Sequence, residues 1–269
     1  MAGEPDWVPP GTDTKRANVA RVYDYLLGGT HNFLADQDVA RTIIAVGGPN
    51  ARAAIRANRD FLGRAVRFLA AAGIRQFLDI GSGIPTESNV HEVAQQADPA
   101  ARVVYADIDP VAIAHSKAIL TGNSNAAVIG ADLREPEKIL AHEETRRLID
   151  FSQPVGLILV AVLHFIADAD DPWQIVATLR EALAAGSYLV LSHGTGEGQP
   201  RLAHAAETIY QRSVSADLFL RPREEVLRFF GGFELVDPGL VEVPHWRPDS
   251  AAEIPAGFWG GLAGVGQKP

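Results

Sequence analysis

The sequence predicts an α/β fold in which a seven-stranded sheet carries helices on both faces and follows a helical N-terminal extension. Strand-like and helix-like segments alternate from Arg75 onward, which is typical of a parallel sheet with crossover helices. The unbroken apolar run Val155–Leu163 fits a strand buried on both faces, so we expect it at the centre. Three helical stretches precede the first strand. We therefore divide the chain into an extension, residues 1–74, and a sheet domain, residues 75–269.

The extension is expected to hold helices near residues 16–27, 36–46 and 50–72. They precede the sheet and cannot pair with it. They can therefore form a helical cap packed on the sheet, a lid over a ligand crevice, or both.

Two features of the extension bear on the lid. Gly29, His31 and Asn32 lie in a break between the first two helices, where polar groups come close together, and this break is the best lid candidate. Tyr23 lies on the apolar stripe of the preceding helix, which favours a core ring over a ligand contact. We keep Tyr23 with the lid as the alternative.

Apolar runs bounded by turn residues locate the strands of the sheet domain. The expected strands are Gln76–Ile80, Val103–Ala106, Ala126–Ile129, Val155–Leu163, Tyr188–Ser192, Phe233–Val236 and Phe258–Val265. Helical periodicity places helices between them, over Thr86–Ala97, from Pro110 to about Leu120, from Pro172 to a stop at Gly186, and over Pro222–Phe230. Asp109 and Asp171 each precede a proline, which is the pattern of an N-cap followed by a first helical turn.

A glycine turn follows the first strand and is the most informative motif. Glycines at 81 and 83 allow a sharp turn and a close backbone approach to a ligand. The dinucleotide-binding fingerprint needs a third glycine, and Thr86 stands at that position. The acid Asp79 before Gly81-Ser82-Gly83 instead resembles the D-x-G-x-G turn of S-adenosylmethionine (SAM)-dependent methyltransferases, whose ligand carries a sulfonium and an ammonium group.

Carboxylates follow the next two strands. Asp107 ends the second strand, where it can accept hydrogen bonds from both ribose hydroxyls, and Ile108 beside it belongs to the same site. Asp109 has the simpler role of capping the next helix. After the third strand, Asp132 and the backbone N–H of Leu133 are expected to read the exocyclic amine and a ring nitrogen of adenine, and the alternative is that Asp132 is a solvated turn residue.

Across residues 75–265 the chain resembles a class I SAM-dependent methyltransferase with a Rossmann-like sheet. More narrowly, it resembles a bacterial S-adenosyl methyltransferase family formerly catalogued as a domain of unknown function. The segments that carry this resemblance are Arg21-Val-Tyr-Asp-Tyr-Leu-Leu-Gly-Gly, His31-Asn-Phe, Asn58-Arg59, Phe77-Leu-Asp-Ile-Gly-Ser-Gly and His91-Glu-Val-Ala. It implies SAM as methyl donor, S-adenosylhomocysteine as product, and no particular acceptor. Pro85 departs from the broad pattern, where many methyltransferases have a third glycine.

Methyl transfer is an in-line displacement that depends mainly on positioning, so a general base matters only if the acceptor must lose a proton. His164 and His193 end the fourth and fifth strands, where open α/β sheets bind ligands, and either is a candidate base. The alternative is a histidine hydrogen-bonded into its loop. No Asn-Pro-Pro-Tyr sequence follows the fourth strand, which disfavours methylation of nucleobase or glutamine amides.

Arginines are concentrated between residues 41 and 76, at positions 41, 52, 56, 59, 64, 67 and 75, against the single acid Asp60. A solvated face is the simplest interpretation. The alternative is that Arg59 or Arg64 meets the methionine carboxylate of SAM or an anionic acceptor.

Composition narrows the class of partner. The net charge of −9 gives no reason to expect nucleic-acid or membrane-surface binding, so a small-molecule acceptor is favoured. The absence of cysteine excludes Cys-based metal sites, we expect no metal, and a reducing, cytoplasmic location fits. No apolar run approaches the ~20 residues needed to span a bilayer, and the first residues do not form a signal peptide.

Three functions are therefore compared: a small-molecule methyltransferase, which is favoured; a catalytically silent SAM- or S-adenosylhomocysteine-binding regulator; and a nucleotide-dependent oxidoreductase, which Thr86 disfavours. The sequence predicts no oligomeric state.

Overall fold

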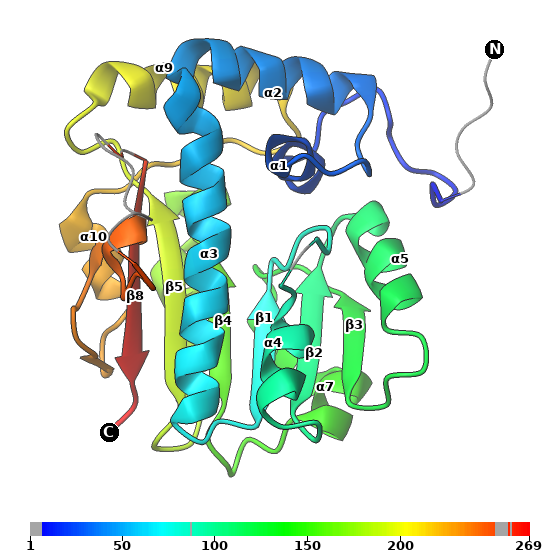
Figure 1. The fold of residues 1–269 in the computed structure, drawn as a ribbon, viewed down its shortest axis with the longest axis vertical. Coiled ribbons are helices and arrows are strands. Elements are labelled where there is room, and N and C mark those ends of the chain that lie inside the picture. Colours follow the sequence, from blue (N-terminus) through cyan, green and yellow to red (C-terminus); the bar gives the residue numbers. More distant parts are fainter. Residues whose placement is uncertain (1–6, 87, 251–257, 259) are drawn as a thin grey trace.

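The structure is a computed structural model that describes residues 7–86, 88–250, 258 and 260–269. One mixed sheet runs through it in the order β3-β2-β1-β4-β5-β8-β6, and β7 pairs with β8 (Figure 1). The strands are β1 (Gln76–Ile80), β2 (Arg102–Asp107), β3 (Ala126–Gly130), β4 (Gly156–Val160), β5 (Tyr188–Gly194), β6 (Glu234–Leu235), β7 (Val241–Glu242) and β8 (Gly261–Gln267). Strands β1 to β5 are parallel, and β8 is antiparallel to β5.

The predicted α/β class is confirmed, with three corrections to the strands. The described sheet has eight strands and not seven, because Val241–Glu242 adds a short ladder on β8. Strand β4 ends at Val160 and not at Leu163, because Ala161 adopts a left-handed φ of 55° and the chain turns into a 3-10 helix. The last strand begins at Gly261 and not at Phe258 as predicted. Trp259, within the predicted strand, lies outside the described residues.

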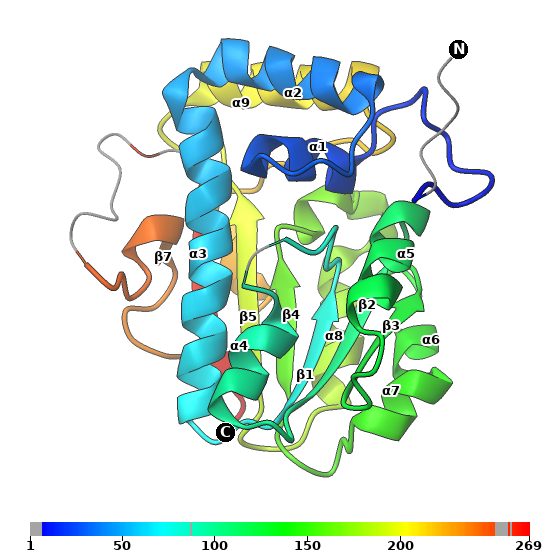
Figure 2. The ribbon, with the colours of Figure 1, turned by 45° about the vertical axis from the view of Figure 1, so that its right-hand side comes forward.

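Helices cover both faces of the sheet (Figures 1 and 2). They are α1 (Val19–Leu27), α2 (Leu34–Gly47), α3 (Pro49–Ala71), α4 (Val90–Ala97), α5 (Pro110–Ile119), α6 (Pro136–Ala141), α7 (Glu143–Leu148), α8 (Pro172–Glu181), α9 (Pro200–Ser213) and α10 (Arg223–Arg228). Alternate residues of each strand feed two separate cores. Leu78 packs with Ile139, Val176 and Val226 of α6, α8 and α10 on one face. Phe77 packs with α3 and α4 on the other.

Helix α4 begins at Val90, four residues later than predicted. A capping box forms there, since the Glu92 carboxylate accepts from the Asn89 backbone N–H at 2.9 Å. Glu87, within the predicted helix, lies outside the described residues. The predicted N-caps are confirmed at Asp109 and Asp171, whose carboxylates accept backbone N–H groups of the first turn.

Three helices form a cap above the carboxyl ends of the parallel strands. Helices α1 and α2 pack with α9 through a small apolar core that includes Val22, Val39 and Val214, and both views show α2 beside α9 over the sheet (Figures 1 and 2). An isolated bridge between Ala17 and Val214 links the start of α1 to the end of α9.

Helix α9 was not among the predicted elements, although Pro200 at its first position is a helix-start signal. Helix α3 packs on the sheet through Phe61 and Leu69, as expected for the part of the extension that covers the sheet. The division of the chain at residue 74 stays a prediction. None of the helices in the described residues is both long and apolar enough to cross a membrane.

Candidate cofactor and acceptor site

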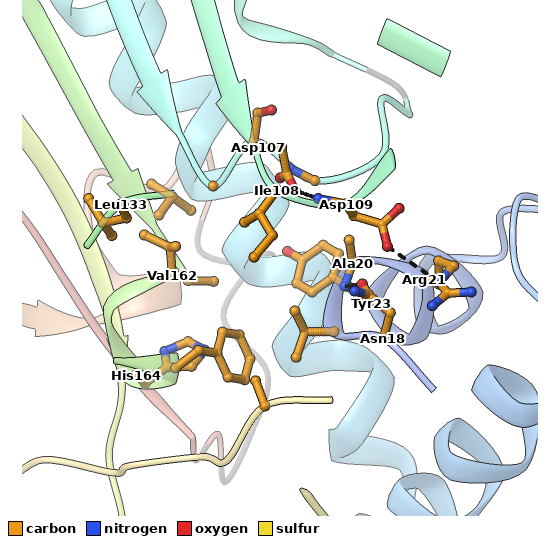
Figure 3. A pocket seen from close by; sticks show the side chains of 18 of the residues that line it. Asn18, Ala20, Arg21, Tyr23, Asp107, Ile108, Asp109, Leu133, Val162 and His164 are labelled. Carbon is orange, nitrogen blue, oxygen red and sulfur yellow. Dashed lines mark hydrogen bonds and ion pairs between the residues drawn. The ribbon is translucent and has the colours of Figure 1, made fainter. Parts of the chain in front are cut away.

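A cavity of about 890 Å³ lies at the carboxyl ends of the parallel strands, beneath α1. Strand order changes direction between β1 and β4, and open α/β sheets bind ligands at such a point. The lining comes from the loops after β1, β2, β3, β4 and β5, from α1 and α3, and from the segment after α9. Figure 3 shows Asp107 and Ile108 at one end of this space, Tyr23 entering from α1, and His164 from the segment after β4.

The predicted glycine turn lines the cavity, and both glycines have the left-handed backbone conformation that suits a sharp turn. Gly81 and Gly83 have φ values of 74° and 66°, and the Gly81 N–H donates to the Ala106 carbonyl at 2.8 Å. Ser82 lies between them. Its hydroxyl is buried and has no hydrogen-bond partner among the described residues, so a polar ligand group would satisfy it.

Gly81→Ala is expected to lower the free energy of unfolding by roughly 2 to 4 kcal/mol and to weaken ligand binding to this turn. A Cβ at Gly81 would lie 2.3 Å from Val162 Cγ2, so overpacking adds to the cost of a left-handed backbone. Gly83→Ala is the matched control, because its φ is equally positive but its Cβ would meet nothing within 4 Å. Denaturant unfolding of both variants measures the difference. Equal losses would show that contact with Val162 does not restrict residue 81.

The Asp107 carboxylate is buried at the end of β2, and its two oxygens are already oriented. One accepts from the Gly83 N–H at 2.7 Å and the other from the Asp109 N–H at 2.9 Å. Burial raises the pKa of Asp107, while these backbone hydrogen bonds lower it. Each carboxylate oxygen has a further lone pair for a hydroxyl. The neighbouring Ile108 side chain is 62% exposed and lines the cavity, an arrangement suited to a flat ring.

Asp109 is an N-cap, as predicted, and has a second contact that the sequence did not indicate. One oxygen accepts from the N–H groups of Val111 and Ala112 at 2.7 and 3.1 Å. The other lies 3.5 Å from Arg21 Nε, and both side chains are almost fully buried (Figure 3). Arg21 belongs to α1, so this ion pair connects the three-helix cap to the end of the site that holds Asp107.

Asp132 and Leu133 also line the cavity, as predicted. Burial acts to raise the pKa of Asp132, but hydrogen bonds and the charge of Arg134 leave it below its usual range. The Arg134 guanidinium donates to Asp132 Oδ2 at 2.6 Å and to Asp132 Oδ1 at 3.0 Å, so the same carboxylate that lines the cavity is paired with a cation. Leu133 is buried beside it.

Asp79 and Arg59 place opposite charges in the lining of the cavity. Asp79 alternates along β1 with Leu78 and Ile80, so it points to the face covered by α3. The pKa of Asp79 is raised to about 7: burial is the main cause, the charge of Arg59 on α3 acts in the opposite direction, and the Asp107 carboxylate adds to the rise. Arg59 also donates to Asn89 Oδ1 at 3.0 Å, and that oxygen accepts the Thr86 N–H at 3.2 Å.

Arg64, offered above as an alternative to Arg59, is not among the lining residues. Its guanidinium donates to the carbonyls of Trp246 and Val243 at 2.9 and 3.2 Å. Five residues along an α-helix correspond to a rotation of about 140°, so Arg59 and Arg64 face different neighbours. The structure gives Arg64 a role in holding the segment after β7.

Both predicted base candidates line the cavity, but neither has a free lone pair. His164 Nδ1 accepts from the Gly194 N–H at 3.1 Å, so neutral His164 carries its hydrogen on Nε2. His193 Nδ1 donates to the Gly194 carbonyl at 2.7 Å, and its Nε2 accepts from Arg221 at 3.0 Å.

The protonation of both histidines follows from burial. It lowers the pKa of His164 well below its usual value and that of His193 to about 4, and the charge of Arg221 adds to both effects. The geometry therefore makes His164 a hydrogen-bond donor and His193 a structural residue, and does not support either as a base.

The predicted lid break lies outside the cavity. The buried Asp24 carboxylate accepts from the His31 N–H at 2.9 Å and from Asn32 Nδ2 at 2.7 Å, and a Cβ at Gly29 would overlap it. The His31 ring packs 3.9 Å from that of His115 on α5. Tyr23 does line the cavity, which agrees with the alternative interpretation of this residue and not with the favoured core position.

Sequence reasoning missed the aromatic residues Phe165, Tyr210 and Phe219, which line the cavity together with Tyr23. Tyr210 lies on the unpredicted α9, and Phe165 was assigned to no element because β4 was extended only to Leu163. In the part of the chain that the structure describes, no cluster of three or more metal-binding side chains occurs.

Comparisons with known proteins agree with this geometry. The family model for S-adenosyl methyltransferases matches residues 5–269. A protein of Thermobifida fusca YX, provisionally assigned as a methyltransferase, is 44% identical with a TM-score of 0.91; the match covers 98% of this chain and 99% of that one. A DUF574 family protein from Streptomyces avermitilis is 40% identical with the same TM-score, and the match covers 96% and 99% of the two chains.

A third solved structure shows the fold alone. It is an O-methyltransferase family protein from Burkholderia thailandensis, 11% identical, with a TM-score of 0.52 over 85% of this chain and 62% of that chain. No curated protein matches. The match over almost the whole sequence, with the glycine turn, the strand-end carboxylates and the strand order behind it, means that this chain belongs to the S-adenosyl methyltransferase family.

Proposed function

We propose that the protein transfers the methyl group of SAM to a small-molecule acceptor enclosed beneath α1. The observation that carries this proposal is one continuous cavity, which runs from Asp79 and Asp107 to Tyr23 and His164. Its volume of about 890 Å³ is near the upper end of the range for small-molecule sites, roughly 300 to 1,000 Å³, which suits a cofactor together with an acceptor.

The residues present fit SAM group by group. Asp107 would take the two ribose hydroxyls, Ile108 would pack against adenine, and Asp132 with the Leu133 N–H would read the adenine edge. Asp79 and Arg59 carry the charges that complement an ammonium and a carboxylate. The unpartnered Ser82 hydroxyl lies on the same turn and would meet a polar group of the ligand.

When bound, SAM supplies an electrophilic methyl group on a sulfonium. The chain's own part is to hold the acceptor in line with that group, which is worth up to ~7–11 kcal/mol, and to keep water out. Helices α1 and α9 close the space from above, and the buried ion pair between Arg21 and Asp109 holds α1 over the site. Residues 1–74, together with α9, would thus complete the acceptor half of the site.

Isothermal titration with SAM, S-adenosylhomocysteine and NAD tests the cofactor. Micromolar binding of the first two and no heat with NAD are expected, because the turn has an acid before Gly81 and Thr86 in place of a third glycine. Binding of NAD without SAM would contradict the proposed function. Tight binding of SAM with no methyl transfer to any acceptor would favour the silent regulator.

A further inference from the structure

We propose that the acceptor is a small planar aromatic molecule that is methylated on a neutral nitrogen and held by the rings of Tyr23, Phe165 and Tyr210. The inference rests on the proposed function and adds the class of substrate. The three rings come from α1, from the turn after β4 and from α9, and all three line the cavity.

Two of the rings are in direct contact, and the third, Tyr23, is close enough to influence the Tyr210 phenol. Phe165 and Tyr210 are stacked, with centroids 5.6 Å apart and an angle of 30° between the planes. Burial and, to a smaller extent, the nearby Tyr23 phenol raise the pKa of Tyr210 to about 12, and burial also raises the pKa of Tyr23, so both phenols are neutral. Flat neutral rings from separate elements favour a flat guest by offset or edge-on stacking.

Tyr23 is held in place before any acceptor binds. Its hydroxyl donates to the Ile55 carbonyl at 3.2 Å and accepts from Asn58 Nδ2 at 2.9 Å. Asn58 Oδ1 in turn accepts from the Ser192 hydroxyl at 2.6 Å, and Ser192 Oγ accepts the Ala161 N–H at 3.0 Å. This chain of hydrogen bonds connects α1 to the ends of β4 and β5. A ring fixed in this way loses little entropy when a guest stacks on it.

His164 adds a polar contact of defined sign. Because its Nδ1 lone pair is used by the Gly194 N–H, its Nε2–H is a donor. The ring lies 4.4 Å from that of Phe165, so the donor is next to the aromatic rings. An acceptor with a ring nitrogen or carbonyl facing His164 would use this donor, while its nucleophilic atom is on another side.

The nucleophile follows from the same histidines. Neither His164 nor His193 has a lone pair free to take a proton, so transfer to a neutral nitrogen is favoured, since it needs no prior deprotonation. The nitrogen lone pair forms the new bond to the methyl carbon while the carbon–sulfur pair leaves with sulfur, giving neutral S-adenosylhomocysteine and a cationic N-methyl product. Aromatic faces attract such a cation.

The test uses the full chain saturated with S-adenosylhomocysteine and three probes of similar size. These are 1,5-naphthyridine, which is planar with two neutral nitrogens; 1,5-dihydroxynaphthalene, which is planar but phenolic; and decahydronaphthalene-1,5-dione, which is uncharged and saturated and is not planar. Calorimetry is expected to give binding of 1,5-naphthyridine at least tenfold tighter than of the saturated probe. With SAM in place of the product, mass spectrometry is expected to show N-methylation of 1,5-naphthyridine and no methylation of the diol.

Variants locate the site. Phe165→Leu and Tyr210→Leu are each expected to weaken 1,5-naphthyridine binding about tenfold and to leave S-adenosylhomocysteine binding unchanged. Tyr25→Leu is the control. It also replaces an aromatic ring by leucine, but Tyr25 does not line the cavity and packs in the small core beneath α2. Circular dichroism melting of each variant identifies any that fails to fold.

Three results would overturn the inference: no binding of 1,5-naphthyridine, equal binding of the saturated probe, or methylation of the diol alone. Each leaves the proposed function standing if S-adenosylhomocysteine has bound in the same experiment. Failure of S-adenosylhomocysteine to bind would instead remove the proposed function itself.

Discussion

Asp107→Ala is expected to weaken SAM binding by about one to two orders of magnitude. If the Asp107 carboxylate takes both ribose hydroxyls, its removal leaves them unpaired in a buried crevice, at a cost of roughly 1.5–3 kcal/mol. The same change removes the acceptor for the Gly83 N–H, so the glycine turn also becomes less well ordered. Titration of the variant with SAM measures the loss.

Asp109 is the matched comparison, two residues along the same chain. Asp109→Ala removes both the N-cap of α5 and the nearer of the two buried carboxylates beside Arg21, so it is expected to lower the free energy of unfolding by roughly 2–4 kcal/mol. Asp109→Asn keeps the cap and loses only the ion pair, so its loss should be smaller by about 1 kcal/mol. Both variants should reduce SAM affinity less than Asp107→Ala does.

Denaturant unfolding and SAM titration of the three variants separate the two roles. A larger loss of affinity at residue 109 than at residue 107 would show that the ribose acceptor has been assigned two residues too early. If neither change affects SAM binding, the ribose is held elsewhere. If Asp109→Ala and Asp109→Asn lose the same free energy of unfolding, the N-cap contributes nothing to stability and the contact with Arg21 explains the whole effect.

SAM affinity is expected to rise as the pH is raised through about 7, and Asp79→Asn is expected to abolish that dependence. Burial raises the pKa of Asp79 from 3.8 to about 7, so the carboxyl is largely protonated below neutral pH. The ionised Asp79 carboxylate attracts the ammonium and sulfonium groups of SAM, so SAM binds more tightly to the protein when Asp79 is deprotonated. Titrations at several pH values between 5.5 and 8.5 check this. A wild-type affinity that does not change with pH would contradict it.

The same group predicts how stability depends on pH. Because the folded-state pKa lies above the unfolded value, the stabilising contribution of Asp79 is fully present below pH 3.8 and is lost as the pH rises towards about 7. The shift of about three pKa units corresponds to at most roughly 4 kcal/mol. Asp79→Asn should therefore be more stable than the wild type above pH 7, although it binds SAM less well.

Asp132→Asn is the control for both pH experiments. Burial and the contacts with Arg134 together leave the Asp132 pKa below its usual range, so this residue does not titrate near neutral pH. The variant should keep the wild-type pH profile of both affinity and stability. A flattened profile in Asp132→Asn would assign the titration to the adenine end of the site and not to Asp79.

Much of the sheet and of the strand-end lining of the cavity was predictable because the signals are local. Strand β1 has the predicted bounds, and the Asp-Pro pairs at 109 and 171 cap the helices expected after them. Asp79, Gly81, Ser82, Gly83 and Asp107 all line the cavity, because parallel strands bring their carboxyl ends to one edge of the sheet. The residues that determine each strand, turn or N-cap lie within a few positions of one another, and the parallel sheet then brings these separate signals together.

The aromatic side of the cavity, with Tyr23 and Tyr210, was not predictable in the same way. Tyr210 faces the site only because α9 folds back beside α2, and Tyr23 is fixed by Asn58, which Ser192 holds from 134 residues away. The choice of Arg59 over Arg64 likewise depends on the rotation of α3 against the sheet.

The sequence by itself determined the α/β class, the order of the first five strands along the chain, the helix caps and the carboxylates and glycines that fit SAM, because each depends on propensities and spacings within one element. The tertiary structure decided which aromatic rings line the cavity, which histidine nitrogen carries a hydrogen, and that Asp109 also pairs with Arg21 of α1. Those features are contacts between segments far apart in the chain, and packing, not local preference, brings such segments together.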